Sequence, residues 1–243
     1  MDAKILLVNS ARATRLTHVC VDYAAKTPGP NGSVAVEGYR VRTLLNDGAL
    51  WAVLIRKHTE LPTDDRYLIR QVLPDELPRV WHWNANLGGP SGVEWPNGVL
   101  TRLHSTAMLL YDLALPGYTN LDADELPGTT PIQGPGVQPP TMSRMVQVTV
   151  PPGAPLDQFR IWLHQGYWYD HRVEEYLEGT LARVIYSDGW EAVSVGEGLC
   201  WHPELRDYHD VQANLHTTLE TVGLTTNEFP QEWFDKEFLG QNW

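Results

Sequence analysis

Short β-prone runs, separated by proline and glycine, constrain this chain more than any other feature of its sequence. In Ser33–Leu45 (SVAVEGYRVRTLL), apolar and polar residues partly alternate, as they do on a strand with one buried face. Asn46-Asp47-Gly48 follows, and then comes the apolar run Ala49–Arg56. Because Asp-Gly between two β-prone runs is a strong hairpin signal, we predict a hairpin here. Further strands are predicted at Tyr67–Leu73 and Arg79–Trp83, and two more within Val99–Leu115.

The second half of the chain begins in the same way. Met145–Val150 (MVQVTV) alternates strictly, and Phe159–His164 (FRIWLH) is again β-prone. A second Asp-Gly turn, Ser187-Asp188-Gly189, lies between the β-prone runs Thr180–Tyr186 and Trp190–Val195. These patterns predict two strands followed by a second hairpin.

From residue 205 onwards, the spacing of the apolar residues changes to that of an amphipathic helix. Pro203 suits the first turn of such a helix, and Gly223 suits its C-terminal end. A second, shorter helix is predicted near Pro230. The residues with the helical spacing are Leu205, Tyr208, Val211, Leu215, Leu219 and Val222.

Charge divides the chain at a proline- and glycine-rich stretch. Residues 1–122 carry 12 acidic and 12 basic side chains, whereas residues 123–243 carry 18 acidic and 6 basic ones. The whole net charge of -12 therefore falls in the second half. We predict a β-rich α+β protein in three parts. These are a β-sandwich or barrel-like domain at 1–126, a Pro/Gly connector at 127–140, and an acidic β unit closed by C-terminal amphipathic helices at 141–243.

Composition excludes several classes of protein. A nucleic-acid surface needs clustered Lys and Arg, and this acidic chain has no such run, so no direct nucleic-acid partner is expected. No segment approaches the roughly 18 apolar residues of a membrane-spanning helix. Residues 1–16 lack the basic region and cleavage site of a signal peptide. Cys20 and Cys200 are expected to be buried thiols, with a disulfide between them as the alternative.

The basic residues are 14 Arg and only 4 Lys, and they occur with 10 Trp and 10 Tyr. Protein–protein interfaces are enriched in Arg, Trp and Tyr and depleted in Lys. The aromatic C-terminal segment is therefore a candidate interface, which would lie in a groove of a partner. Packing on its own domain is the alternative. The interface residues of this hypothesis are Trp233, Phe234, Phe238 and Trp243.

Groups that could carry catalysis or hold a metal are scattered along the chain. The densest cluster is His164, Asp170, His171 and Glu174, with Glu175 beside it, which a loop could bring together or which could form a solvated face. His202, His209 and His216 recur every seven residues and would lie about 10 Å apart on a helix, too far to share a metal. No nucleophile elbow or phosphate-binding loop is present. We predict no catalytic residue, metal or cofactor.

Two short motifs, His104-Ser105-Thr106 and His216-Thr217-Thr218, carry the pattern His-x-Thr. Paired motifs of this kind resemble those of the 2H phosphoesterase family, in which the two copies on facing strands supply an acid, a base and phosphate contacts. The resemblance covers these six residues. It departs from the family because the second copy falls within the predicted helix.

Tryptophans near glycine and proline loops allow another function. Trp81, Trp83 and Trp95 cluster in the sequence with Asn84, Asn86 and Asn97. Rigid aromatic side chains beside amides could stack on the rings of a polysaccharide, so a carbohydrate-binding module is the alternative to an assembly protein. The same tryptophans could instead fill the end of a β-sandwich.

These features together favour a non-enzymatic structural subunit of a larger assembly. In general character, though in no motif, the chain resembles virion proteins of tailed bacteriophages, such as tail, baseplate or head–tail components. This resemblance implies a soluble protein that is made in the cytoplasm and incorporated into a virion. Its expected partners are other protein subunits, including copies of itself in a homo-oligomer.

Overall fold

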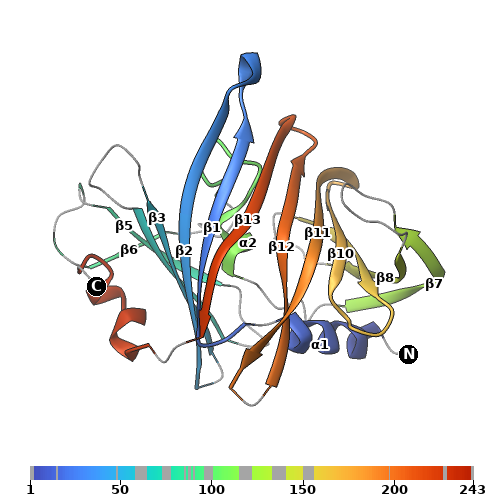
Figure 1. The fold of residues 1–243 in the computed structure, drawn as a ribbon, viewed down its shortest axis with the longest axis horizontal. Coiled ribbons are helices and arrows are strands. Elements are labelled where there is room, and N and C mark those ends of the chain that lie inside the picture. The colour runs from blue at the N-terminus through green and yellow to red at the C-terminus, as the bar shows by residue number, and fades with distance from the viewer. Residues whose placement is uncertain are drawn as a thin grey trace. The chain divides into compact units, whose positions relative to one another are not determined.

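The computed structural model (Figure 1) describes residues 3–14, 16–47, 49–57, 65–72, 78–84, 86, 89, 91–95, 101–114, 122–132, 141–149, 156–196, 198–226 and 229–241. Its helices are α1 (Ala3–Thr14) and α2 (Leu110–Ala114), with the short 3₁₀ turns η1 (Pro30–Gly32), η4 (Gln231–Phe234) and η5 (Lys236–Phe238). Its strands are β1 (Val19–Pro28), β2 (Val34–Asn46), β3 (Ala49–Lys57), β4 (Asp65–Val72), β5 (Arg79–Trp83), β6 (Val93–Glu94), β7 (Asp122–Ile132), β8 (Thr141–Thr149), β9 (Gln158–His164), β10 (Asp170–Leu177), β11 (Thr180–Val195), β12 (Gly198–Asp210) and β13 (Leu215–Thr226).

The strands of the described residues form one antiparallel sheet in the order β6-β5-β4-β3-β2-β1-β13-β12-β11-β10-β9-β8-β7. The predicted fold class, a two-domain sandwich or barrel closed by C-terminal helices, is therefore wrong. Nearly every strand pairs with its neighbour in sequence, so the sheet grows hairpin by hairpin, and only β1 beside β13 joins distant segments.

The chain divides into two compact units, each described here by itself. Unit 1 comprises Met1–Arg15 and Gly117–Leu219, and unit 2 comprises Leu16–Pro116 and Glu220–Trp243. The predicted boundaries at 126 and 140 stay a prediction. Residues 127–132 of the predicted connector belong to β7, and residues 133–140 lie outside the described residues.

The predicted helix over residues 205–222 is wrong, because this segment forms strands β12 and β13 and the turn between them. Tyr208 and Leu219 are buried as the pattern requires, but Val211 and Val222 are 51% and 63% exposed. The turn residue Asn214 has a positive φ of 50°, which Asn tolerates better than most residues. The threonine-rich sequence after it favours strand over helix.

The second predicted hairpin is also misplaced. β11 runs without a break from Thr180 to Val195, and its register with β12 is the same on both sides of Gly189. Gly189 adopts a positive φ of 63° inside the strand. The real turn is at Glu178 and Gly179, whose φ values of 50° and 71° fit a type I′ hairpin between β10 and β11.

Several other predicted elements are confirmed. The hairpin around Asn46-Asp47-Gly48 is β2–β3, and the strands predicted at 67–73, 79–83, 145–150 and 159–164 overlap β4, β5, β8 and β9. The strands predicted within 99–115 are wrong, since its described part holds one isolated bridge, Arg102 to Leu109, and then α2. The short helix near Pro230 is a pair of 3₁₀ turns.

Unit 1 buries a row of apolar side chains that crosses five strands. Val146, Ile161, Val173, Ile185 and Tyr208 are successive cross-strand partners, and each is at most 7% exposed. Helix α1 packs on β7, β8 and β12 and buries its own leucines at 6 and 7. Burial of these large side chains is the main stabilising term of the unit.

The next row of unit 1 contains a buried ion pair. Glu175 and Arg183 are cross-strand partners, and Arg183 Nε donates to Glu175 Oε2 at 2.6 Å. The two side chains are 0% and 4% exposed, and the buried Asp210 is the partner of Arg183 on the next strand. Removal of either charge alone should destabilise the fold, because the other charge would remain buried without its partner.

Replacing Arg183 with Met should lower the free energy of unfolding by about 3–5 kcal/mol, measured by urea denaturation. The double variant R183M/E175L should recover part of this loss, since it removes both charges. As a control, Lys26→Met breaks the ion pair with Glu220, whose side chains are 42% and 37% exposed, and should cost less than about 1 kcal/mol. Equal costs for the buried and the exposed pair would contradict this account.

Candidate ligand-binding site

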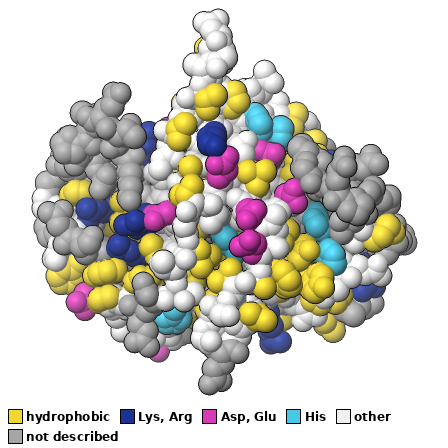
Figure 2. Space-filling model, in the orientation of Figure 1, with side chains coloured by type: hydrophobic (Ala, Val, Ile, Leu, Met, Phe, Trp, Pro, Cys, Tyr) yellow, Lys and Arg dark blue, Asp and Glu magenta, His cyan; other side chains and the backbone are white. Residues whose placement is uncertain are grey.

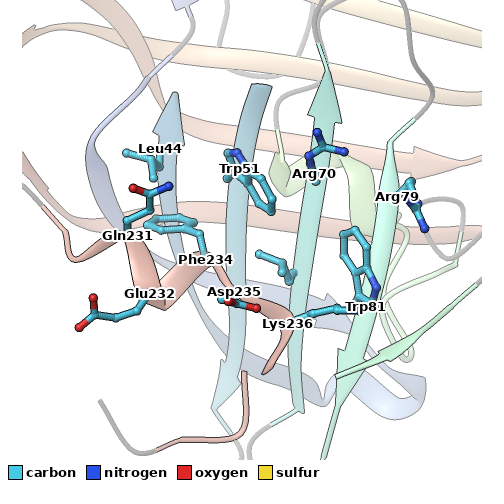
Figure 3. Close-up of a pocket in the computed structure, with 11 residues that line it drawn as sticks. Leu44, Trp51, Arg70, Arg79, Trp81, Gln231, Glu232, Phe234, Asp235 and Lys236 are labelled. Carbon is cyan, nitrogen blue, oxygen red and sulfur yellow. The ribbon is translucent and has the colours of Figure 1, made fainter. Parts of the chain in front are cut away.

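Unit 2 holds a cavity of about 610 Å³ between the sheet and the C-terminal 3₁₀ turns (Figure 3). Its volume falls within the range of about 300–1,000 Å³ that is usual for small-molecule sites. Strands β2 to β5 form its floor, and η4 and η5 form its opposite wall. The lining residues are Leu44, Trp51, Leu68, Arg70, Arg79, Trp81, Gln231, Glu232, Phe234, Asp235 and Lys236.

The register of the sheet sets the order of side chains on the cavity floor. Leu44, Trp51, Arg70 and Arg79 are successive cross-strand partners on β2, β3, β4 and β5. The row beside them continues through Leu68 and Trp81, which are 1% and 8% exposed. Because side chains two residues apart share a face, both rows point toward the cavity. The floor is therefore apolar and aromatic, with two cations at one end.

Arginine stacks on tryptophan throughout this face of unit 2. The guanidinium carbon lies 4.3–5.2 Å from a ring centroid in each pair, which is within the range of cation–π attraction. Two of the pairs line the cavity, namely Arg70 over Trp51 and Arg79 over Trp81, both at 5.2 Å. The other two are Arg42 over Trp233 and Arg66 over Trp83.

The C-terminal segment is held to the sheet by apolar and polar contacts. Phe234 and Leu239 are 3% and 0% exposed in a cluster with Leu44, Val53, Ile55, Leu68 and Trp81. Gly92 N donates to Lys236 O at 2.7 Å, and Arg66 Nη1 donates to the backbone carbonyls of Leu239 and Gln241. These contacts fix the wall of the cavity.

The structure places three of the four predicted interface residues on η4 and η5, which form this wall. Phe234 packs on its own sheet, Trp233 is half-buried under Arg42, and Phe238 is 39% exposed. Packing of the segment on its own unit, the alternative considered for this sequence, is thus present for Phe234. An interface role for these residues stays a prediction, and Trp243 lies outside the described residues.

The three tryptophans of the carbohydrate hypothesis do not form one platform. Trp81 and Trp83 share a face of β5, but Trp81 is buried beneath the C-terminal segment. Trp95 is tilted against His82 and stacks on Tyr67, with centroids 5.3 and 6.0 Å away, on the other face of the sheet. Carbohydrate binding stays a prediction that this geometry does not favour.

The histidine and carboxylate cluster of unit 1 is only partly assembled. The rings of His164 and His171 lie 5.5 Å apart, and burial lowers the pKa of both. Asp170 accepts a hydrogen bond from Ser187, and Glu174 pairs with Arg172. Within the described part of the chain, no three His, Cys, Asp or Glu side chains stand close enough to hold a metal ion.

The three histidines predicted to share a helix face lie on strands instead. A spacing of seven places His202 and His209 on opposite faces of β12, because strand side chains alternate. His209 stacks on His216 of β13, with ring centroids 4.3 Å apart. His202 is 6% exposed, and its burial, together with the nearby Arg206, lowers its pKa to about 3.

The two His-x-Thr motifs use their threonines internally. Thr106 Oγ1 donates to Leu103 O at 2.5 Å, and Thr218 Oγ1 donates to Asp207 Oδ1 at 2.7 Å. The second motif lies on strand β13, as in the phosphoesterase family and contrary to the helix predicted here, whereas the first lies in a turn before α2. Phosphoesterase activity stays a prediction.

The charge distribution and the two cysteines bear on two further predictions from the sequence. On the face drawn in Figure 2, acidic and basic side chains are interspersed with hydrophobic ones, so the acidic excess of residues 123–243 makes no continuous patch there. Cys20 and Cys200 are both half-buried, and no disulfide joins them. Among the described residues, no helix is long and apolar enough to cross a membrane.

Known proteins share this fold but not this sequence: no family model and no curated protein matches the chain. The structure is similar to a putative outer membrane lipoprotein-sorting protein domain from Vibrio parahaemolyticus, with a TM-score of 0.81, 11% identity, and coverage of 99% of this chain and 100% of that one. It is also similar to a DUF1329 family protein from Desulfovibrio piger, with a TM-score of 0.76, 12% identity, and coverage of 98% of this chain and 97% of that one. A LolA superfamily protein from Nitrosomonas europaea has a TM-score of 0.72 and 13% identity, with coverage of 98% of this chain and 100% of that one. At these identities the likeness shows the fold.

These similarities overturn the predicted role as a tailed-bacteriophage virion component. The three solved structures named above, which cover 98–99% of this chain, are a putative lipoprotein-sorting domain, a DUF1329 family protein and a LolA superfamily protein. The assembly hypothesis drew in part on abundant arginine and aromatic residues, which are enriched at protein–protein interfaces. In unit 2 many of these residues stack on one another within the chain.

Sequence reasoning missed the residues that line the cavity, apart from Trp81 and Phe234, which it assigned to other functions. Arg70 and Arg79 are far from Leu44 in sequence, and only the strand register brings them into one row. The one available signal was the arginine bias among aromatic residues.

The buried His202 should make the protein less stable in acid. Its pKa of about 3 lies below the ordinary value of about 6.5, so the unfolded chain binds a proton that the folded chain does not. The free energy of unfolding should therefore fall by about 2 kcal/mol more between pH 7 and pH 5 in the wild type than in His202→Gln. Parallel pH profiles of the two proteins, measured by urea denaturation, would contradict this assignment.

Proposed function

We propose that this protein is a non-catalytic carrier that binds a lipid or the acyl chains of a lipid-modified protein in the cavity of unit 2. One observation carries the proposal: a cavity of ligand size with an apolar, aromatic floor lies within a fold shared with lipoprotein-sorting proteins. Its site of action would be the cell envelope, where lipoproteins are sorted. A homo-oligomer stays a prediction.

The lining of the cavity supports an apolar ligand. Leu68, Trp81 and Phe234 present buried apolar surface at its floor and wall, and Trp51 adds a half-buried ring. Transfer of apolar surface out of water stabilises a complex by about 25 cal/mol per Å², or about 0.8 kcal/mol per buried methylene. An acyl chain laid along this floor would gain most of its affinity in this way.

A carrier needs a binding site that its ligand can leave, and the wall of this cavity suits that need. The wall is formed by two short 3₁₀ turns, whose backbone hydrogen bonds are few and close to solvent. Segments of this kind open locally at lower cost than the strands of a sheet. The ligand could then enter and leave without unfolding the sheet beneath it.

The test is a fluorescence titration with a dansyl-labelled triacylated lipopeptide, followed by its transfer from donor to acceptor vesicles. We expect saturable binding and faster transfer in the presence of the protein. Trp51→Ala should weaken binding about tenfold, because it removes apolar contact area from the cavity floor.

Trp201→Ala is the matched control, because Trp201 is a half-buried tryptophan on β12, outside the cavity. Its affinity should equal that of the wild type. Absence of lipopeptide binding, or an equal loss in the two variants, would refute the proposed function.

A further inference from the structure

We propose that the cavity of unit 2 selects an amphiphile with an anionic headgroup, a phosphate or a carboxylate, which Arg70 and Arg79 bind. The apolar chain of the ligand would lie on Leu68, Trp81 and Phe234. This inference rests on the proposed function and goes beyond it, because it names the chemistry of the headgroup and the residues that recognise it.

The first argument is the pairing of two like charges. Arg70 and Arg79 are direct cross-strand partners on β4 and β5, and like charges in this position repel each other. Arg79 has a carboxylate partner in Glu94, at 2.7 Å, but these side chains are 51% and 49% exposed, so the pair is weak. Within the described residues, no carboxylate pairs with Arg70. An anion between the two guanidinium groups would relieve the repulsion.

The second argument is the position of Arg70 over an aromatic ring. Its guanidinium lies over the ring of Trp51, with 5.2 Å between the guanidinium carbon and the ring centroid. A stacked guanidinium keeps its N–H donors in its own plane, where they can bind two oxygens of a phosphate or carboxylate. Stacking also restricts the side chain before the ligand arrives, which lowers the entropic cost of binding.

The third argument is the separation of charge from apolar surface across the cavity. Figure 3 shows Arg70 and Arg79 on neighbouring strands at one end, and Glu232 on η4 at the opposite side. Asp235 also belongs to that wall, where its carboxylate accepts a hydrogen bond from Glu237 N at 2.9 Å. Lys236 also lines that wall, with its ammonium 3.7 Å from Glu237 Oε1, so the wall carries both signs of charge. The anionic headgroup is attracted to the two arginines on the strands, which orients an amphiphile with its chain along the apolar part of the floor.

Isothermal titration calorimetry with three probes separates headgroup from chain: monododecyl phosphate below its micellar concentration, 1-dodecanol below its solubility limit, and inorganic phosphate. We expect dodecyl phosphate to bind at least tenfold more tightly than dodecanol. Inorganic phosphate should show no binding in the same range, because it lacks the chain. The advantage of dodecyl phosphate should shrink between 0.05 and 0.5 M NaCl, as expected for charges that salt can screen.

The variant Arg70→Gln should lose at least tenfold in affinity for dodecyl phosphate and stay within twofold for dodecanol. Arg70→Lys should fall between wild type and Arg70→Gln, since it keeps the charge but not the planar donors. Arg160→Gln is the matched control, because Arg160 also stacks on an aromatic ring, that of Tyr176, at 4.8 Å and lies in unit 1. Unfolding curves of all variants serve to check that each is folded.

The outcomes distinguish the two proposals. Equal binding of dodecyl phosphate and dodecanol would overturn the anionic selectivity and leave the lipid-carrier function standing. If Arg70→Gln kept the wild-type preference for dodecyl phosphate over dodecanol, the anionic selectivity would also be overturned. Tight binding of inorganic phosphate alone would also overturn it, since the site would then recognise a free anion. Failure of both amphiphiles and of the lipopeptide to bind would overturn both proposals.

Discussion

The packing of the C-terminal segment on β2–β5 is the interaction on which the candidate site depends. Phe234 and Leu239 cover a face that would otherwise expose Leu68, Trp81 and their apolar neighbours to water. The segment does not fill this face completely, and the remaining space is the cavity. Core and binding site are thus built from the same side chains. A strongly bound segment would close the site, and a weakly bound one would leave the sheet face exposed.

The sequence predicted strands well and their assembly poorly. The hairpin at Asn46-Asp47-Gly48 was found because residues 34–57 combine β-prone runs with a strong turn signal. The hairpin predicted at Asp188-Gly189 was wrong because Gly189 adopts its positive φ within one long strand, without a turn. The helix prediction for residues 205–222 was wrong because six apolar residues there fit a helical spacing by chance. The β-branched neighbours and the turn before residue 215 favour a hairpin instead. Local patterns do not contain the cross-strand pairing that decides such cases.

The candidate site could not be found from sequence for the same reason. Its floor is one row across four strands, and the members of that row are set by register. Composition nevertheless held a clue in its 14 Arg, 4 Lys and 10 Trp, which were assigned to a protein interface. A planar guanidinium stacks on an indole ring as a lysine ammonium cannot. An excess of Arg over Lys among aromatic residues is therefore typical of protein interfaces, and it is also typical of an aromatic sheet face whose cations lie beside an apolar floor.

The two units differ in whether they can accept an apolar chain. Beside the buried apolar row of unit 1 lies a row with Glu175, Arg183 and Asp210, and an acyl chain that separated these groups would leave buried charges without partners. In unit 2 the cavity floor combines leucine and tryptophan with Arg70 and Arg79, and a headgroup can pair with these two charges. Entry of a chain there displaces water from apolar surface and breaks no buried ion pair. This difference in cost, more than the size of the cavity, supports the proposal that the ligand binds in unit 2.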